Sequence, residues 1–328
     1  MEQRKKRISI VTPCYNEQDN VGVCCDTVRR IFESELPDYD YEHIFCDNAS
    51  TDGTPDVLAA LAAKDPRVKV IFNARNFGPF RSTYNGVTSA SGDAVLLMLA
   101  VDMQDPPQLL PRFVRLWEQG HEVVYGVRQG REESWLMRNV RRLYYKTVSS
   151  LADIEIPLNV GEFQLVDRKV VDALRQCDDY YPYIRGLVAN CGFRRAGVEY
   201  VWRARKRGFS KNRLYHLVDQ GLNGLVSFTN VPMRVCLLAG FLLSALSVGY
   251  ALFTFIYHLL FKGAGPPGMA TLITGFFFLS GVQLFVSGIL GEYIAAIHAQ
   301  VRKRPLVIER GRLNFTSAED QRADRRAA

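Results

Sequence analysis

Two adjacent stretches without charged residues, in the last third of the chain, limit most strongly what this sequence can fold into. Residues 235–261 and 263–291 contain no Asp, Glu, Lys or Arg. A helix of about 20 apolar residues spans the roughly 30 Å hydrocarbon core of a bilayer. Both stretches are long enough, so the sequence predicts two transmembrane helices, at residues 234–261 and 269–291. A buried hairpin in a soluble core is the alternative.

The charges around these stretches predict their orientation. A basic run at residues 203–211 and Arg234 precede the first stretch, and Arg302, Lys303 and Arg304 follow the second. Because basic loops stay in the cytoplasm, both flanks are expected there, in a multi-pass protein of the inner (cytoplasmic) membrane. Residues 214–233 are amphipathic and are expected at the membrane interface. Residues 292–328 form a predicted cytoplasmic tail, disordered from residue 311.

Residues 1–213 alternate between short apolar runs and helical patterns. The runs predict strands at residues 7–13, 41–46, 68–72, 95–99 and 121–126, and the patterns between them predict helices at 21–32, 55–64 and 81–90. Strands that alternate with helices at this spacing form a doubly wound, mostly parallel sheet with helices on both faces. The fold class is therefore α/β, followed by the two membrane helices.

Charge and cysteine content narrow the partners. The formal net charge of +7 suits phosphorylated ligands or anionic membrane surfaces. No basic helix interleaved with aromatic residues and no zinc-finger spacing occurs, so nucleic acid is not expected as a partner. The seven cysteines are scattered without a Cys-x-x-Cys pair, which favours a reducing compartment over a disulfide framework.

The turn at residues 100–107 carries the strongest chemical signal. Asp102 and Gln104 follow the apolar run 95–99, and ligands of open α/β sheets bind beyond the carboxyl ends of the strands. Two oxygen ligands separated by one residue suit a divalent cation that bridges phosphates. The alternative is structural, because Asp105 followed by Pro106 and Pro107 is also a good helix start.

Five motifs occur along the chain: TPCYNE at 12–17, DNASTDG at 47–53, RNFG at 75–78, DMQDPP at 102–107, and GILGEY at 288–293 with RPL at 304–306. Their order resembles family 2 glycosyltransferases, and in particular the polyprenyl-phosphate sugar transferases similar to dolichol-phosphate mannose synthases and bactoprenol glucosyltransferases. The resemblance covers about residues 7–310.

The resemblance implies a GT-A catalytic domain that takes a nucleotide sugar and passes the sugar to a polyprenyl (undecaprenyl or dolichyl) phosphate at the cytoplasmic face, for cell-envelope glycan synthesis. It implies that Pro13, Asn16 and Glu17 line the nucleotide pocket and that Asp47 contacts the base. Asp102 and Gln104 would hold Mg²⁺ or Mn²⁺ on the diphosphate. Taken alone, Asp47 could instead form a turn, and Asn16 and Glu17 could cap a helix.

Two residues depart from the family pattern. Ala100 stands where the family usually has the first Asp of an Asp-x-Asp motif, so one contact to metal or ribose is missing. Glu162 stands where the family tends to have Asp, which moves the carboxylate outward by one methylene. Ala100 leaves open a degenerate copy that acts as a membrane adaptor. Another alternative is a transferase for a glycolipid or polysaccharide acceptor.

The transfer reaction adds two groups of candidate residues. Two anions must be brought together, which requires fixed positive charge. Candidates for binding the acceptor phosphate are Arg128, Arg131, Arg205, Ser210 and Lys211, although the basic run could equally serve attraction to anionic lipid. Glu162 is expected to orient the acceptor or take its proton, with Asp102 as the second catalytic residue; pairing of Glu162 with an arginine is the structural alternative.

The predicted spans also carry small residues. Glycines in membrane helices allow close helix contacts, so a homo-oligomer is expected. The glycines concerned are Gly240, Gly249, Gly275, Gly281 and Gly288.

Overall fold

The computed structural model describes residues 4–129, 160–177, 179, 182–201, 231–260, 268–302 and 304–316. The chain divides into two compact units. The first, called here the catalytic unit, comprises residues 1–149, 154–213 and 304–328; the second comprises residues 150–153 and 214–303. The predicted interfacial segment up to residue 230 and the basic run 203–211 lie outside the described residues.

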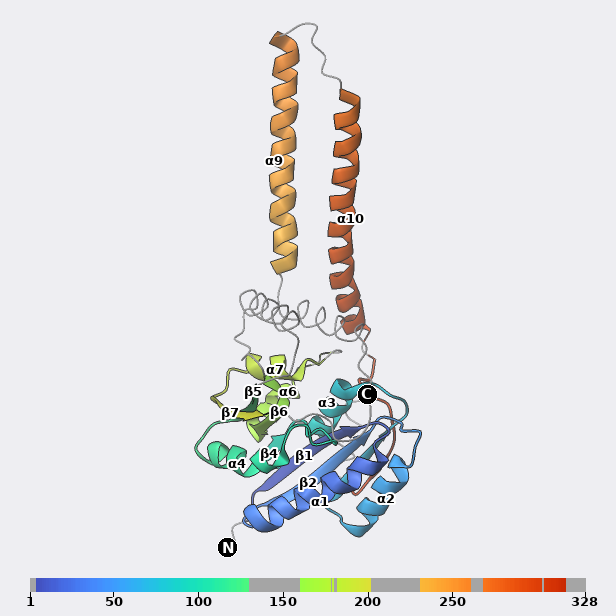
Figure 1. Cartoon of the computed structure of the whole chain (residues 1–328), viewed down its shortest axis with the longest axis vertical. Helices are drawn as coiled ribbons and strands as arrows, with labels where there is room; N and C mark the ends of the chain where they lie inside the picture. Colours follow the sequence, from blue (N-terminus) through green and yellow to red (C-terminus); the bar gives the residue numbers. More distant parts are fainter. Residues whose placement is uncertain are drawn as a thin grey trace. The chain divides into compact units, whose positions relative to one another are not determined.

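One mixed sheet forms the centre of the catalytic unit (Figure 1). In the described residues it has eight strands in the order β7-β5-β6-β4-β1-β2-β3-β8. Four pairings are parallel (β1–β2, β2–β3, β1–β4 and β5–β7), and the three others are antiparallel. The strands are β1 (Arg7–Cys14), β2 (Asp40–Asp47), β3 (Val68–Asn73), β4 (Ala94–Leu96), β5 (Val123–Gln129), β6 (Val160–Asp167), β7 (Arg195–Val201) and β8 (Glu309–Leu313).

Helices cover both faces of this sheet, as alternate residues of β1 show. Ile10 belongs to the buried core that β1 shares with α1, α2 and α4, whereas Val11 faces α3 on the other side. A Cβ on Gly86 of α3 would lie 2.6 Å from both Val11 Cγ1 and Cys46 Sγ, so only glycine allows this approach. The helices are α1 (Gln18–Glu35), α2 (Thr54–Lys64), α3 (Pro79–Ser89), α4 (Leu110–Glu118), α6 (Arg168–Leu174) and α7 (Ile184–Asn190). The predicted α/β sheet with helices on both faces is confirmed.

The fourth strand is shorter than predicted. Residues 95–99 were expected as a strand, and β4 covers only Ala94–Leu96. Beyond it the chain stays extended, because the Leu97 amide donates to Gln164 O (2.8 Å) and the Leu99 amide to Val11 O (2.8 Å). The backbone thus runs between β6 and β1 up to the turn that holds Asp102.

The predicted disorder from residue 311 is wrong for residues 311–316. Strand β8 pairs antiparallel with β3, so the chain returns to the catalytic unit after the second unit. An edge strand such as β3 would otherwise expose a row of unpaired backbone groups. After β8, Asn314 donates from its side chain to Ala62 O (2.7 Å) and Val68 O (2.8 Å), which fixes the end of the strand.

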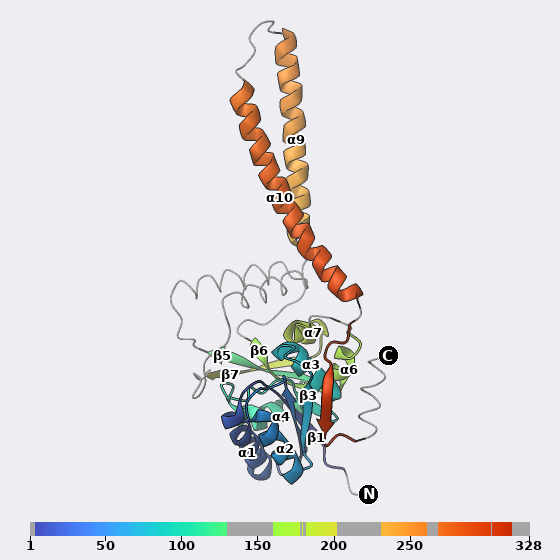
Figure 2. The same cartoon turned by 90° about the vertical axis from the view of Figure 1, so that its right-hand side faces the viewer.

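The second unit contains two long helices, α9 (Val231–Leu260) and α10 (Gly268–Val301), which contact each other (Figure 2). Large apolar side chains on both are exposed, including Phe241 and Phe285. Among the described residues, the segment Phe278–Ala295 of α10 is the one long and apolar enough to cross a membrane. The prediction of a second span stays a prediction. Helix α10 also extends ten residues beyond the predicted end at residue 291.

Candidate functional site

The carboxyl ends of β1 and β2 lie side by side and begin the candidate site. The parallel register pairs Pro13 with Cys46 and Cys14 with Asp47. The Asn48 amide donates to Cys14 O at 3.0 Å, so the two strands stay joined where their loops begin. The motif residues at 12–17 and 47–53 therefore start from the same edge of the sheet.

The two loops are held together by side-chain hydrogen bonds. The backbone N–H of Asn16 donates to Ser50 Oγ (2.9 Å), and the backbone N–H of Thr51 donates to the Asn16 side-chain oxygen Oδ1 (2.8 Å). The Glu17 amide donates to Thr54 Oγ1 at 2.9 Å. Glu17 occupies the N-cap position of α1, but its side chain makes no cap hydrogen bond. These contacts hold the loops after β1 and β2 in a fixed shape; together with the loop after β4 they are called the rim below.

Asp47 is fully buried at this rim. Its two carboxylate oxygens accept the Ser50 amide at 3.3 and 3.2 Å, so the turn-forming role considered from the sequence does occur. Burial raises the pKa of the Asp47 carboxyl above its ordinary value, while the hydrogen bonds from Ser50 work in the opposite direction. The Asp47 carboxylate thus fixes the turn that follows β2.

Three residues with left-handed backbone mark the three rim loops. Asn16, Ala49 and Met103 have φ angles of 55°, 57° and 54°. Asn tolerates this conformation, but for Ala and Met it costs on the order of 1 kcal/mol each. Such strain persists where the surrounding structure demands it, and it clusters at functional sites. Its occurrence in each of the loops after β1, β2 and β4 supports one shared ligand site.

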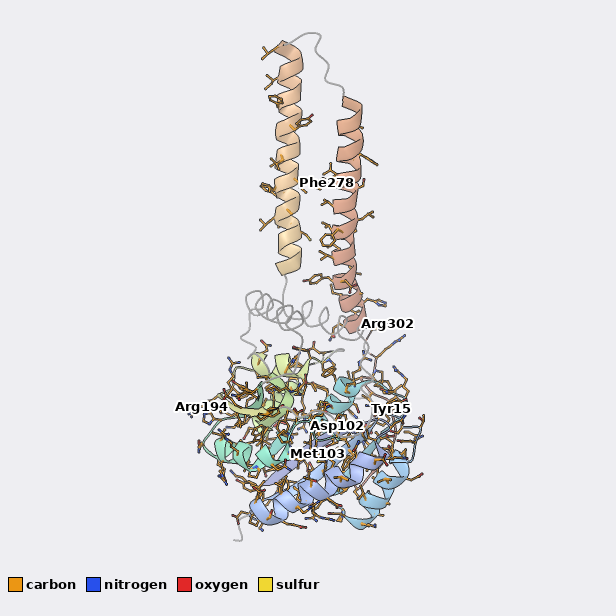
Figure 3. All side chains as sticks on the ribbon, in the orientation of Figure 1. Tyr15, Asp102, Met103, Arg194, Phe278 and Arg302 are labelled. Atoms are coloured by element: carbon orange, nitrogen blue, oxygen red, sulfur yellow. The ribbon has the colours of Figure 1, made fainter. Side chains whose placement is uncertain are left out.

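The third loop presents Asp102 and Gln104, and Figure 3 labels Asp102 and Met103 in the catalytic unit. The backbone N–H of Met103 donates to Ala100 O (2.8 Å), and the backbone N–H of Gln104 donates to Asp102 Oδ1 (3.3 Å). No group of three His, Cys, Asp or Glu side chains that could hold a metal occurs among the described residues. A carboxylate and an amide oxygen suit Mg²⁺ or Mn²⁺ only if phosphate and water supply the other ligands. The residues therefore fit a cation that arrives with a diphosphate.

Asp105 does not start a helix. The N-cap position before the 3₁₀ turn Pro107–Leu109 is Pro106, which makes no side-chain cap. Asp105 is instead buried and accepts Arg128 Nη2 at 3.2 and 3.1 Å as well as the hydroxyl of Tyr200. Arg128 Nε donates to Tyr200 Oη at 3.0 Å. Although burial opposes its charge, the Asp105 carboxylate and Tyr200 hold the pKa of Arg128 above its ordinary value.

Glu162 lies within β6. Its Oε1 is 3.8 Å from Arg185 Nε on α7, and Arg185 also donates to Val160 O at 3.0 Å. Because β6 is antiparallel to β4 and β5, its first residues lie at the edge where those strands end. A Cβ on Gly161 would lie 2.9 Å from Arg128 Nη2, and the charge of Glu162 also contributes to the raised pKa of Arg128.

The remaining acceptor candidates, Arg131, Arg205, Ser210 and Lys211, lie outside the described residues. The sequence did not predict Tyr200, which contacts Arg128, or Arg185, which contacts Glu162. No local pattern marks them, because their partners are distant in sequence.

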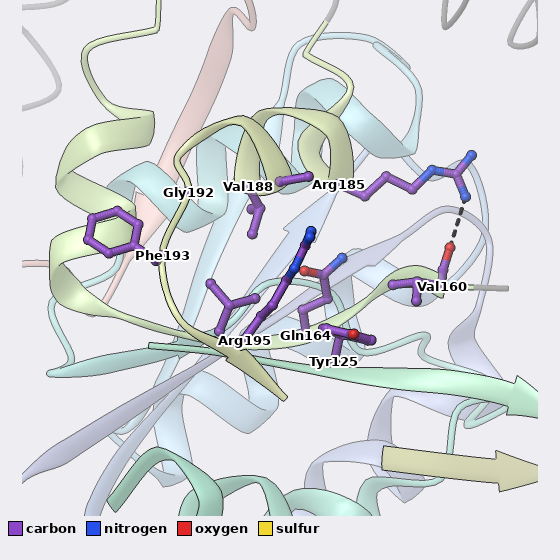
Figure 4. Close-up of a pocket in the computed structure, with 10 residues that line it drawn as sticks. Tyr125, Val160, Gln164, Arg185, Val188, Gly192, Phe193 and Arg195 are labelled. Atoms are coloured by element: carbon purple, nitrogen blue, oxygen red, sulfur yellow. Dashed lines mark hydrogen bonds between the residues drawn. The ribbon is translucent and has the colours of Figure 1, made fainter. Parts of the chain in front are cut away.

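A separate cavity of about 110 Å³ lies between α7 and the sheet (Figure 4). Gln164, Arg185 and Arg195 line it together with apolar side chains such as Val188 and Phe193. Neither Asp47 nor Asp102 contributes to it. Sites for drug-sized ligands usually occupy about 300–1,000 Å³, so this cavity is too small for a nucleotide sugar.

Comparison with known proteins agrees with this geometry. Residues 9–175 match the glycosyl transferase family 2 domain, and residues 231–297 match the GtrB C-terminal hairpin. The chain belongs to family 2 of the glycosyltransferases, and it is a glycosyltransferase with the GT-A type of α/β fold.

Individual relatives are similar over nearly their whole length. The Bacillus subtilis glycosyltransferase YkcC is 34% identical over 93% of this chain and 94% of its own. A prophage-derived bactoprenol glucosyl transferase of Shigella flexneri is 34% identical over 92% of this chain and 97% of its own. Among solved structures, a mannosyltransferase of Pyrobaculum calidifontis aligns over 92% of this chain with 17% identity and a TM-score of 0.47.

Proposed function

We propose that this protein transfers a sugar from a nucleotide sugar of the UDP-glucose or GDP-mannose type to polyprenyl phosphate. One observation carries the proposal: the loops after β1, β2 and β4 meet at one edge of the sheet, and each contains a left-handed residue beside a predicted ligand contact. The similarity to the Shigella flexneri bactoprenol glucosyl transferase over 92% of this chain supports the lipid acceptor.

Asp102 and Gln104 would hold Mg²⁺ or Mn²⁺, which would neutralise charge that develops on the leaving diphosphate. Pro13, Asn16 and Glu17 would line the nucleotide pocket, and Asp47 would contact the nucleobase. The backbone N–H of Gln104 donates to the Asp102 carboxylate and so orients it before the donor binds.

The acceptor phosphate is largely ionised near neutral pH, since the second pKa of a phosphate monoester is about 6. Glu162 therefore needs only to orient it or to remove a remaining proton, and Arg185 at 3.8 Å keeps the Glu162 carboxylate in place. Arg128, Arg131, Arg205, Ser210 and Lys211 would offset the repulsion between the two anionic substrates. One in-line displacement inverts the anomeric carbon.

The second unit would anchor the enzyme as a multi-pass protein of the inner membrane with the catalytic unit in the cytoplasm, where it would serve cell-envelope glycan synthesis. The exposed apolar side chains of α9 and α10 support a lipid environment, because soluble proteins rarely expose such large apolar surfaces. The glycines of both helices would permit packing into a homo-oligomer.

The test uses the full chain in detergent with a short polyprenyl phosphate, Mg²⁺ or Mn²⁺, and a panel of nucleotide sugars. Release of nucleoside diphosphate from one donor, dependent on both lipid phosphate and cation, is the expected result. Asp102→Ala should abolish release while the unfolding temperature stays unchanged, and Glu33→Ala, an exposed carboxylate near the carboxyl end of α1, serves as its control.

Other outcomes contradict the proposal in specific ways. Release that requires a glycolipid instead of the lipid phosphate would identify a different acceptor. Binding of nucleotide without release from any donor would mean that Ala100 has removed catalysis.

A further inference from the structure

One arginine, Arg310, occupies a β-bulge in strand β8, which follows the second unit. Strand β8 pairs Gly311 with Phe72 and Glu309 with Asn73, so Arg310 is the extra residue between two consecutive pairs. Bulges of this kind re-aim a side chain and are frequent beside active sites. Because β8 is antiparallel to β3, its first residues lie where β3 ends, at the edge of the sheet that carries the rim loops.

A single row of residues joins this bulge to Asp47. The strand register pairs Cys14 with Asp47, Asp47 with Phe72, and Phe72 with Gly311. The guanidinium of Arg310 lies 5.9 Å from the centre of the Phe72 ring, within the reach of a cation–π contact. Phe72 therefore lies between Asp47 and Arg310 in this row of paired residues.

The next residues of the row strengthen the connection. Asn73, which pairs with Glu309, donates from Nδ2 to Asn48 Oδ1 at 2.9 Å, and Asn48 follows Asp47 directly. The Ala74 amide donates to Ile308 O at 2.8 Å. Residues 308–311 of the tail are thus bonded to the end of β3, whose Asn73 side chain contacts Asn48, the residue after Asp47.

Arg310 retains donors for a ligand. It is exposed, and within the described residues no carboxylate lies within ion-pair distance of it. Arg312, two residues further along, differs in this respect, because Glu309 occupies its guanidinium. The charge of Arg310 nevertheless acts on Asp47, since it opposes the rise that burial causes in the pKa of that carboxyl.

Asp47 and Arg310 together form an acceptor and a donor for one planar ring. Uracil presents N3–H between two carbonyl oxygens, and guanine presents N1–H beside O6. A carboxylate can accept that N–H while a guanidinium donates to the neighbouring oxygen. Cytosine and adenine carry an unprotonated nitrogen at the corresponding position, where a carboxylate finds no donor.

We propose that Arg310, supplied by the C-terminal strand β8, binds the nucleobase of the donor and, with Asp47, selects uracil or guanine over cytosine and adenine. This inference rests on the proposed function, because it concerns the base end of the same nucleotide site. In this proposal, strand β8, which follows the second unit in the chain, is part of the site that binds the nucleotide sugar.

The experiment measures binding by calorimetry to the full chain in detergent with Mg²⁺. The probes are UDP, GDP, CDP, ADP and pyrophosphate. The variants are Arg310→Ala and Arg310→Gln, and Arg30→Ala, an exposed arginine on α1, is the matched control. Arg310→Ala should weaken the preferred diphosphate by about tenfold, the loss expected for one hydrogen bond from a charged donor.

The same variant should change the affinity for CDP, ADP and pyrophosphate by no more than about twofold, as an exposed charge does. It should also raise the KM for the donor while kcat stays nearly constant, because the base takes no part in the bond that breaks. Arg310→Gln, which keeps N–H donors, should fall between the wild type and Arg310→Ala.

Two results would overturn the inference and leave the proposed function standing. One is equal affinity of Arg310→Ala and Arg30→Ala for UDP and GDP in an enzyme that still transfers sugar. The other is an equal loss for pyrophosphate, which would place Arg310 on the phosphates. If the wild type bound none of the nucleotides, the proposed function itself would fail.

Discussion

Arg128 at the end of β5 donates from Nη2 to both carboxylate oxygens of Asp105, at 3.2 and 3.1 Å. Asp105 lies three residues after Asp102, in the same turn. Tyr200 on β7 completes the contact, because it accepts from Arg128 Nε and donates to Asp105. The pair therefore joins the predicted cation-binding turn to the far strands of the sheet.

Loss of either partner of this pair should destabilise the catalytic unit. Both side chains are largely buried, and removal of one member of a buried ion pair typically costs about 3–5 kcal/mol because the other charge stays unpaired. We expect Asp105→Asn and Arg128→Met each to lower the free energy of unfolding by about that amount. Urea unfolding followed by tryptophan fluorescence measures it.

The double variant Asp105→Leu/Arg128→Met is the control for this prediction. With neither charge present, it should recover most of the stability that each single change loses. Losses that simply add in the double variant would contradict a direct pairing. If Arg128 also binds the acceptor phosphate, the stable double variant will still transfer sugar poorly.

Regular patterns predicted most of the sheet but not its edges. The apolar runs located β1, β2 and β3 to within one residue at each end, because buried parallel strands read as continuous apolar segments. Strand β8 (Glu309–Leu313, ERGRL) carries mainly charged residues on a partly exposed edge, so its local sequence resembles a tail. Its stabilising contacts reach across the chain: Asn314 bonds to Val68, 246 residues away.

The candidate site shows the same division. Asn16, Asp47 and Asp102 each follow a strand that the apolar runs predicted, and the carboxyl ends of β1, β2 and β4 meet at one edge of the sheet. The helix start considered as an alternative for Asp105 does not occur, and its actual partner Arg128 could not be read from a local pattern. Arg310 was missed because its position depends on a bulge, which no local pattern in the tail announces.

Buried His43 should make stability depend on pH. Its ring lies fully inside the sheet with Nε2 2.9 Å from Thr12 Oγ1, and burial lowers its pKa from 6.5 to about 3. Below pH 6.5, His43 binds a proton in the unfolded chain but stays neutral in the folded chain. Stability that is present above pH 6.5 is therefore lost as the pH falls toward 3, by up to about 1.4 kcal/mol per pH unit.

The measurement compares the free energy of unfolding from pH 7 to pH 5 in the wild type and in His43→Gln. The wild type should show the steeper decline, because it alone carries the buried imidazole at position 43. Parallel curves for the wild type and His43→Gln would contradict a neutral buried imidazole.

Asn314 should control how firmly β8 stays on the sheet. It has a left-handed backbone (φ 62°) and donates from its side chain to Ala62 O and Val68 O. Asn314→Ala loses both hydrogen bonds and places a Cβ in an unfavourable conformation, for a total of about 2–3 kcal/mol. Amide hydrogen exchange at Arg312 and Leu313 should accelerate accordingly, because local opening governs it.

Asn314→Gly separates the two causes. Glycine adopts the left-handed conformation without strain, so this variant should lose only the hydrogen bonds and exchange more slowly than Asn314→Ala. If both variants exchanged at the wild-type rate, the side chain of Asn314 would not be what holds β8.

Glu162 should act on the rate of transfer more than on stability. Glu162→Gln keeps the size of the side chain but removes the charge that Arg185 contacts at 3.8 Å. General-base or acceptor-orienting carboxylates typically contribute about 10²–10⁴-fold, so we expect kcat to fall by at least about 10²-fold. The rate of nucleoside diphosphate release at saturating donor and lipid phosphate measures this change.

Two further variants distinguish catalysis from a merely structural ion pair. Glu162→Asp, which restores the residue that the family tends to have, should recover much of the rate because the carboxylate remains at the edge of the sheet. Glu199→Gln removes an exposed carboxylate on β7 and should leave kcat unchanged. If Glu162→Gln instead lowered the unfolding temperature while kcat stayed at the wild-type value, the carboxylate would serve only to hold α7 through Arg185.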